Sequence, residues 1–190
     1  MSALRDGIER SVSVPSRLSA PALGFGLATL IALVDQVAKW LVLYPLSLET
    51  VGQVRLISFF DLTYVRNYGV SFGALQAQSE TARWLLVALT AAIAAGVAVW
   101  LTREKLRGEA LALGMILGGA IGNIIDRVRL GYVIDYADLH FGDFRPFAIF
   151  NVADAAITIG VLLLIARSLL VRDKDAKTGA ATPRATEEVS

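Results

Sequence analysis

The sequence predicts an α-helical integral membrane protein with four membrane-spanning helices and a small β-rich segment between the first two spans. Hydrophobic residues make up 55% of the 190 residues, and the mean hydropathy is +0.59. Soluble domains are about 45–50% apolar, and their apolar residues alternate with charged ones. Here the charges cluster in a few places and leave long neutral stretches, as in proteins that cross a membrane several times.

The composition also excludes several classes of function. The chain has no cysteine, which rules out disulfides and thiol catalysis. Its single histidine, His140, leaves too few ligands for a histidine-based zinc site. No basic stripe lies away from the termini, so we expect no nucleic-acid partner.

Long apolar runs give the positions of the spans. The run over 21–46 is too long for the apolar region of a signal peptide and lacks a convincing cleavage site, so we expect a retained helix. Residues 47–80 alternate apolar and polar side chains and are rich in Val, Phe, Tyr, Gly and Ser, which indicates short strands. Within a membrane domain over 21–170, the expected spans are residues 22–44, 84–102, 110–126 and 152–170.

Four spans place both chain ends on the same side of the membrane as the charged loop over 103–109. Basic residues are concentrated in these three segments, and the positive-inside rule puts them in the cytoplasm. We therefore expect a polar cytoplasmic segment over 1–20 and a disordered cytoplasmic tail over 171–190. The segments over 47–80 and 126–150 then face outward.

Two groups of residues stand out in the first and third spans. Asp35 and Lys39 are four residues apart and therefore lie on one helix face. They form either a structural ion pair or a pair that orients a polar group nearby, because charges inside a membrane mark sites. In the third span Gly114, Gly118 and Gly122 form a ridge of small residues, which we interpret as a helix-packing surface.

Polar residues also gather at the end of the third span. Asn123 and Asp126 share a helix face, and the plain structural interpretation is that the helix ends there with Asp126 paired to Arg127 or another arginine. Asp135 lies in a β-like apolar stretch over 132–136.

The fourth span carries a carboxylate near its start. An ionised aspartate in hydrocarbon costs at least ~2.5–3.5 kcal/mol, so Asp154 needs an explanation. Asn151 as N-cap with an acidic residue three positions later resembles a capping box, which would explain Asp154 structurally. Asp138 and Asp143 lie in more polar surroundings, and we expect both to be solvated loop residues.

The predicted topology brings these polar groups together near the outer ends of the third and fourth spans. Two close carboxylates at a water–lipid boundary cannot both ionise cheaply, so they titrate as a unit. An aspartic hydrolase needs such a pair to activate a water molecule. This hydrolytic mechanism needs no metal and no organic cofactor, and we expect neither. Spacing alone gives both Asp126 and Asp135 access to Asp154, and the choice between them stays open at this point.

Four motifs resemble the bacterial lipoprotein signal peptidases (signal peptidase II). They are "DQVAK" in the first span, "VRNYGVSFG" in the first outer segment, "GGAIGNIIDRVRLGYVIDY", and "FNVADAAITIG". They occur in the order of that family and cover most of residues 30–165. The departures are small: "VIDY" stands where the family often has Val-Val-Asp-Phe, and "YGVSFG" where Gly-Ala-Ala-Phe is common.

The resemblance implies a multi-pass aspartic endopeptidase of the bacterial inner membrane, with its active site near the periplasmic face. Such an enzyme removes signal peptides from diacylglyceryl-modified prolipoproteins, cleaves N-terminal to the lipidated cysteine of the substrate, and is inhibited by globomycin-type antibiotics. By motif, the catalytic residues are Asp135 and Asp154. The supporting or substrate-binding residues are Asp35, Lys39, Asn67, Gly69, Asn123, Asp126, Arg127, Asn151 and Ala153. The resemblance also implies an outer β cradle, and we expect a monomer whose partners are its prolipoprotein substrates and membrane lipids.

Two other classes of function were weighed against this one. A small transporter or channel would use Asp35, Lys39 and Asp154 as an ion relay, but it predicts an internal repeat or discontinuous spans, and we see no convincing repeat. A non-catalytic assembly subunit would explain the glycine ridge. It would give no reason for carboxylates at residues 135 and 154.

Overall fold

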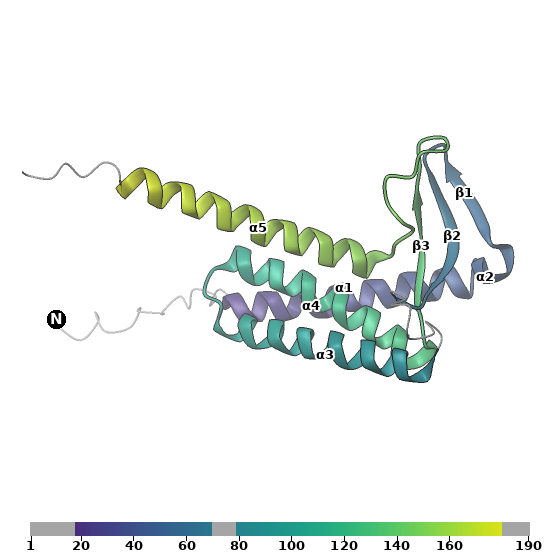
Figure 1. Cartoon of the computed structure of the whole chain (residues 1–190), viewed down its shortest axis with the longest axis horizontal. Coiled ribbons are helices and arrows are strands. Elements are labelled where there is room, and N and C mark those ends of the chain that lie inside the picture. Colours follow the sequence, from purple (N-terminus) through teal and green to yellow (C-terminus); the bar gives the residue numbers. More distant parts are fainter. Residues whose placement is uncertain (1–17, 70–78, 180–190) are drawn as a thin grey trace, which may run out of the picture.

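The computed structural model describes residues 18–69 and 79–179, with side chains as far as residue 170. In this part of the chain four long helices run in roughly one direction, and a small sheet lies at one end of them (Figure 1). Three predicted segments lie partly outside the described residues: the N-terminal segment over 1–20, the β-rich segment over 47–80 and the C-terminal tail.

The four long helices are α1 (Ala20–Leu43), α3 (Glu80–Arg103), α4 (Arg107–Leu130) and α5 (Val152–Gly179). A 24-residue helix such as α1 is about 36 Å long, enough for a hydrocarbon core of about 30 Å. Each of the four is long and apolar enough to cross a membrane. The predicted fold class is confirmed, and α1, α3 and α4 differ from the predicted spans by only a few residues at their ends.

The fourth span ends as predicted, because the part of α5 that is apolar enough to cross a membrane is Val152–Leu170. The predicted disordered tail requires a correction, since the helix continues beyond this span to Gly179. No proline or glycine occurs between residue 171 and Gly179, and lysine, arginine and alanine favour helix, so the backbone stays helical beyond its apolar part.

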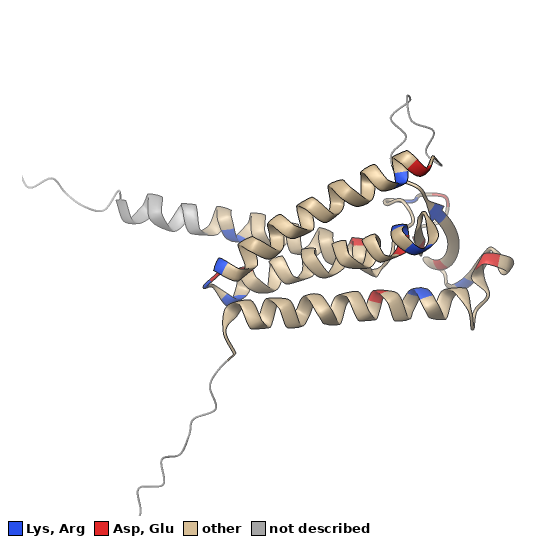
Figure 2. Ribbon diagram, turned by 90° about the horizontal axis from the view of Figure 1, so that it is seen from below, with Lys and Arg blue, Asp and Glu red and all other residues tan. Residues whose placement is uncertain are grey.

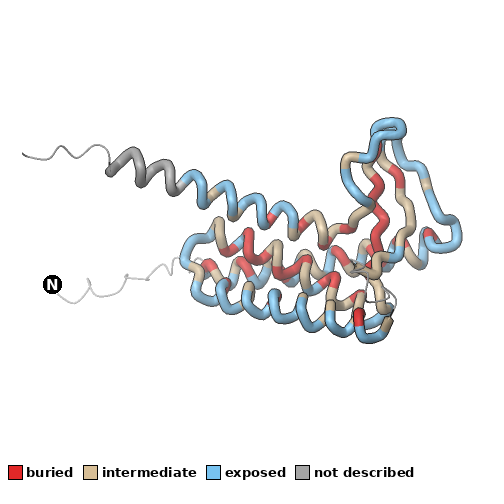
Figure 3. Tube along the Cα trace, in the orientation of Figure 1, coloured by how far each residue is buried: buried red, intermediate tan, exposed pale blue. Residues whose placement is uncertain are grey.

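Helix α4 lies at the centre of the bundle and packs against α1, α3 and α5. Half of the residues in the most apolar 18-residue stretch of α4 are buried, against 11% for α3. Figure 3 shows the buried residues running along α4. A Cβ atom at Gly114 would collide with the backbone of Gly24, and one at Gly118 with the backbone of Ala28. The predicted glycine ridge is therefore a packing surface that lets α1 and α4 approach closely.

The sheet is built from two separate parts of the chain. After the short helix α2 (Leu48–Val51) come the strands β1 (Gln53–Ile57) and β2 (Phe60–Asn67), and β3 (Val133–Leu139) follows α4. The three strands pair antiparallel in the order β1-β2-β3. We expected the cradle between the first two spans alone. A lone hairpin is only marginally stable, and β3, from between α4 and α5, completes the sheet.

The expectation that Asp138 is solvated is wrong, whereas Asp143 is exposed as predicted. Asp138 is only 1% exposed, because every residue from 133 to 138 is buried and β3 is covered on both faces. Its carboxylate is compensated by the Arg145 guanidinium, with Nε 3.1 Å from Oδ1, and by the Thr63 hydroxyl, which donates across 3.2 Å.

Charged side chains concentrate at the two ends of the helices and leave most of their length neutral (Figure 2). The exception in α1 is Asp35 and Lys39, which lie within the helix toward the end that carries the sheet. Both are buried, so they must be compensated inside the protein.

Candidate active site

Asp135 lies in the middle of β3 and is 2% exposed. Its Oδ2 accepts a hydrogen bond from Asn67 Nδ2 at 2.9 Å, and its Oδ1 accepts one from Asn151 Nδ2 at 2.7 Å. Burial raises the pKa of Asp135 to about 6, and the nearby charge of Asp154 adds to this effect, while the two asparagine donors oppose it. Asp135 is therefore a carboxyl group that can hold a proton near neutral pH.

Asp154 lies in the first turn of α5 and is half-buried. Its backbone N–H donates to Asn151 Oδ1 at 2.9 Å, and its Oδ2 accepts from the backbone N–H of Asn151 at 3.3 Å. These reciprocal bonds are the predicted capping box, which is confirmed. The other oxygen, Oδ1, accepts from Asn123 Nδ2 at 2.8 Å, so the carboxylate is held from two helices.

Asn151 connects the two aspartates. Its side chain donates to Asp135, and its backbone N–H donates to Asp154. It is 1% exposed and also donates to the carbonyl of Ile134 at 3.2 Å, which fixes the plane of its amide. One residue at the junction of strand and helix thus positions both carboxylates.

A buried ion-pair group lies next to this pair. Lys39 Nζ is 2.8 Å from Asp35 Oδ2, as predicted, and 2.7 Å from Asp126 Oδ2. It also donates to Asn123 Oδ1 at 3.2 Å, which orients the amide that holds Asp154. Asp35 in turn accepts from the backbone N–H of Ala153 at 3.0 Å. The group therefore connects α1 and α4 to the start of α5.

Asp126 belongs to this ion-pair group. Besides Lys39, it accepts from the backbone N–H of Ile134 at 3.2 Å and so fixes the start of β3. Its partner is Lys39, not the neighbouring Arg127 that the structural interpretation of the sequence favoured. Of the two candidates for the partner of Asp154, it is Asp135 that shares Asn151 with it.

Gly69 supports the site through Asn67. It follows β2 with φ = +92°, a backbone conformation that glycine adopts without strain. Its N–H donates to Asn67 Oδ1 at 2.8 Å. With the oxygen held in this way, the Nδ2 of Asn67 points toward Asp135.

Arg127 is half-buried in α4, and its charge interacts with Asp126, Asp135 and Asp154. Within the described part of the chain its buried Nε has no hydrogen-bond partner. The structure thus brings Arg127 near the carboxylates without pairing it directly to one of them. The other ten predicted site residues are joined by the hydrogen bonds and ion pairs given above.

Two residues of the site were missed in the sequence, and the first is Gln36. Its Nε2 donates to Asp126 Oδ1 at 2.9 Å and to the carbonyl of Gly122 at 3.2 Å, so it ties α1 to α4 beside the ion-pair group. The signal was present, because Gln36 is an amide inside an apolar span between two charged residues.

The second is Arg83, near the start of α3. Its Nε donates to the carbonyl of Arg127 at 2.8 Å and its Nη2 to that of Val128 at 2.6 Å. It thereby satisfies the carbonyl of Val128 in the last turn of α4 and is a second donor to that of Arg127, which also accepts from the N–H of Gly131. No periodic pattern in the sequence indicates such a cap, because the residues that it joins are separated by 44 and 45 positions in the chain.

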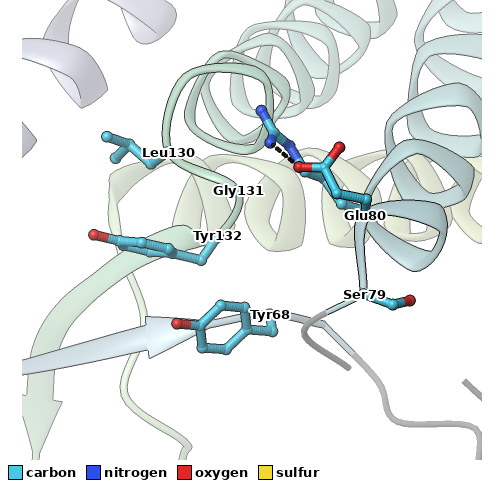
Figure 4. A pocket seen from close by; sticks show the side chains of 7 residues that line it. Tyr68, Ser79, Glu80, Leu130, Gly131 and Tyr132 are labelled. Atoms are coloured by element: carbon cyan, nitrogen blue, oxygen red, sulfur yellow. Dashed lines mark hydrogen bonds and ion pairs between the residues drawn. The ribbon is translucent and has the colours of Figure 1, made fainter. Parts of the chain in front are cut away.

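This contact borders a small pocket of about 210 Å³ at the sheet end of the bundle. Figure 4 shows Tyr68 and Tyr132 on one side of it and Glu80, which pairs with Arg83 at 3.2 Å, on the other. The chain leaves α4 at Gly131 and enters β3 here, so Arg83 helps to fix the start of the strand that carries Asp135.

Each aspartate faces a larger pocket. One of about 320 Å³ is mostly apolar and is lined by Asp154 together with Phe147, Phe150, Ala155 and Ile159. The other, of about 410 Å³, is more polar and is lined by Asp135 together with Arg66, Asn67, Tyr68 and Ile149. Ala148 lines both, so the two pockets adjoin.

Known proteins that resemble this chain belong to one family. The family model described as signal peptidase (SPase) II matches residues 27–170. The lipoprotein signal peptidase of Sphingopyxis alaskensis is 58% identical over 161 residues, which are 84% of this chain and 93% of the relative. That of Rhizorhabdus wittichii is 58% identical over 151 residues, 80% of this chain and 88% of the relative.

Two solved structures, each described as a bacterial membrane enzyme, share the fold. One has a TM-score of 0.66 and 29% identity and covers 77% of this chain and 92% of its own. The other has a TM-score of 0.63 and 26% identity and covers 88% of this chain and 94% of its own. With the family model matching most of the chain, this protein belongs to the signal peptidase II family of lipoprotein signal peptidases.

Proposed function

We propose that the chain is an aspartic endopeptidase in which Asp135 and Asp154 cleave the signal peptide from diacylglyceryl-modified prolipoproteins, N-terminal to the lipidated cysteine. The observation that carries this proposal is the pair of hydrogen bonds from Asn151, one to each carboxylate. Asp126 is a weaker candidate, because its oxygens are occupied by Lys39, Gln36 and the backbone of Ile134.

In this mechanism Asp135 carries the proton and Asp154 is ionised. Asp154 takes a proton from a water molecule as the water oxygen attacks the scissile carbonyl carbon, while Asp135 donates its proton to the carbonyl oxygen. The tetrahedral intermediate then collapses. Asp154 returns its proton to the leaving nitrogen and the C–N bond breaks. As the carboxylic acid forms, one hydroxyl of the intermediate gives its proton back to Asp135.

The two adjoining pockets suit a substrate that is part lipid and part peptide. The apolar pocket beside Asp154 reaches the outer side of α5 through Ile159, which is exposed along the apolar helix. The pocket beside Asp135 offers Arg66, Asn67 and Tyr68 as hydrogen-bonding groups. The apolar side would take the membrane-embedded part of the substrate, and the polar side the segment that becomes the mature protein.

We also propose that the sheet faces the periplasm of a bacterial inner membrane. Arg103, Lys105 and Arg107 lie at the α3–α4 connection, at the end of the bundle away from the sheet. Loops with an excess of lysine and arginine stay in the cytoplasm. This orientation puts the two carboxylates at the outer surface of the membrane.

The test is cleavage of a diacylglyceryl prolipoprotein by Asp135→Asn and Asp154→Asn. Asparagine keeps the size of the side chain and one accepting oxygen but cannot transfer a proton, so each substitution should lower kcat by about 10²–10⁴-fold. Asp143→Asn, in the exposed loop after β3, is the control and should cleave normally.

Thermal unfolding in detergent must show that both variants fold. Normal cleavage by either folded variant would refute the pair. Loss of cleavage in Asp126→Asn with full cleavage in Asp135→Asn would move the role to Asp126.

A further inference from the structure

The end of the sheet farthest from α1 carries exposed aromatic side chains that no step of the mechanism uses. Phe141 is 58% exposed and Phe144 is 65% exposed, and Phe59 in the turn between β1 and β2 is 45% exposed. The rings of Phe59 and Phe141 stack with centroids 6.3 Å apart. We call these three residues the aromatic tip.

Backbone hydrogen bonds in the two turns hold the aromatic tip rigidly. Phe141 and Phe144 exchange backbone hydrogen bonds of 2.8 and 3.2 Å across a tight turn, in which Gly142 has φ = +63°. The N–H of His140 donates to the carbonyl of Phe59 at 3.0 Å and so joins the two turns. A soluble protein gains nothing from fixing three phenylalanines in water, so this construction indicates a surface that covers them.

The position of the tip identifies that surface. The strands run across the direction of the helices, so they lie roughly parallel to the plane of a membrane that the helices cross, and the end with the β1–β2 turn projects past α5 (Figure 1). The segment over 140–151 leaves β3 and returns to α5 on the side of the sheet that faces the helices. Phe147 of this segment, 62% exposed, lines one pocket together with Ile159 of α5, and α5 also exposes Leu162 and Leu163. The segment therefore connects the tip to the exposed apolar side of α5.

Two arginines lie near the tip, while Asp143 in its tight turn is exposed. Arg145, whose side chain is half exposed, pairs with the buried Asp138, and Arg55, 77% exposed, lies 3.7 Å from the buried Asp61. Arginines beside aromatic rings are typical of the boundary between lipid and water, where the rings enter the acyl region and the cations meet phosphate groups.

We propose that the aromatic tip inserts into the interface of the leaflet beside α5 and sets the height of Asp135 and Asp154 relative to the bilayer. β3 joins the two features directly, since it carries Asp135 and ends next to Phe141. Insertion of the tip then keeps the strand at one depth while the substrate approaches within the leaflet.

The depth of the tip can be measured independently of the proposed catalytic residues. The chain has no cysteine, so Phe144→Cys and the control Thr50→Cys each give one site for a spin label. Thr50 is exposed on α2, at the outermost end of the molecule along the helix direction. In vesicles of phosphatidylethanolamine and phosphatidylglycerol, the label at residue 144 should collide more with oxygen, which dissolves in lipid, and less with a water-soluble nickel chelate. The label at residue 50 should show the opposite.

A second measurement separates anchoring from folding. Cleavage by Phe141→Ser/Phe144→Ser should fall about tenfold in vesicles and stay unchanged in detergent micelles, where no bilayer has to be matched. Phe141→Trp/Phe144→Trp should restore cleavage in vesicles, because tryptophan favours the interface. Equal exposure of the two labels to the nickel chelate would refute the proposal, as would an equal loss of cleavage in vesicles and micelles.

Discussion

An amide, and not a charged group, lies between the two carboxylates. A lysine or arginine at residue 151 would favour the ionised form of both aspartates and would remove the proton that the reaction requires. Asn151 gives each carboxylate a hydrogen bond without adding charge. Lys39, one of the cations of the site, is paired with Asp35 and Asp126, where it offsets buried charge.

This arrangement predicts how cleavage depends on pH. The pKa of Asp135 is raised to about 6, and its protonated form is the proton donor, so kcat/KM should fall as the pH rises through about 6. Asn67 donates to the ionised form and therefore lowers this pKa. Asn67→Ala should raise the pKa, and the fall in kcat/KM should move upward by about one pH unit, the equivalent of losing one hydrogen bond to a charged group.

The matched control is Gln53→Ala. Gln53 also donates its side-chain amide to a carboxylate of the sheet, but that carboxylate is Asp61, at 2.8 Å. Its pH profile should match that of the unmodified enzyme. A downward move of the profile in Asn67→Ala would contradict the assignment of the proton to Asp135.

Sequence reasoning found most residues of the site, because charged and amide groups are rare in apolar helices and stand out there. It could not choose between Asp126 and Asp135. The spacing of Asp126 and Asn123 shows that they lie on one face of a helix. The neighbouring sequence does not show that this face contacts Lys39 of α1. The choice depends on contacts between residues more than 80 positions apart in the sequence.

At the scale of elements, the contact between α1 and α4 controls the ion-pair group. A Cβ atom at Gly122 would lie 2.5 Å from Oδ2 of Asp35, too close for any real contact. Gly122→Ala should therefore push the Asp35 carboxylate away from Lys39 and destabilise the fold by about 1–3 kcal/mol, with reduced cleavage. Thermal unfolding in detergent and a cleavage assay measure the two effects.

Gly96 supplies the control for this substitution. It lies in α3, and a Cβ atom there would meet nothing within 4 Å. Gly96→Ala should keep full cleavage and equal or greater stability, because alanine favours helix over glycine. An equal loss of stability in both variants would show that the effect does not come from the contact with Asp35.

The elements themselves were predictable to different degrees. The four long helices follow from apolar runs that are long enough to cross a membrane. The strand character of residues 132–136 could also be expected, but not its pairing with β2. Antiparallel pairing of Asp135 with Val65 is fixed by where α4 ends, and Arg83 on another helix helps to hold that end. Long-range contacts of this kind do not produce a periodic pattern in the sequence.

At the scale of the whole molecule, the proposed orientation can be tested with single cysteines. In intact cells, Thr50→Cys on α2 should react with a membrane-impermeant maleimide from outside. Lys105→Cys, in the loop between α3 and α4, should react only after the inner membrane is opened. The outer membrane is made permeable first in both samples, and the cysteine-free parent chain gives the background. Labelling of residue 105 before residue 50 would reverse the proposed topology.

The capping box at the start of α5 affects which residues are favoured at position 154 once activity is no longer needed. Asp154 is proposed to transfer a proton, and its Oδ2 also accepts from the backbone N–H of Asn151 at the start of a membrane helix, a hydrogen bond worth about 0.5–1.5 kcal/mol. Folding alone therefore favours a hydrogen-bond acceptor at residue 154 in a descendant that has lost its activity. An acidic residue there is weaker evidence for a working enzyme than one at residue 135, which lies in a strand and caps no helix.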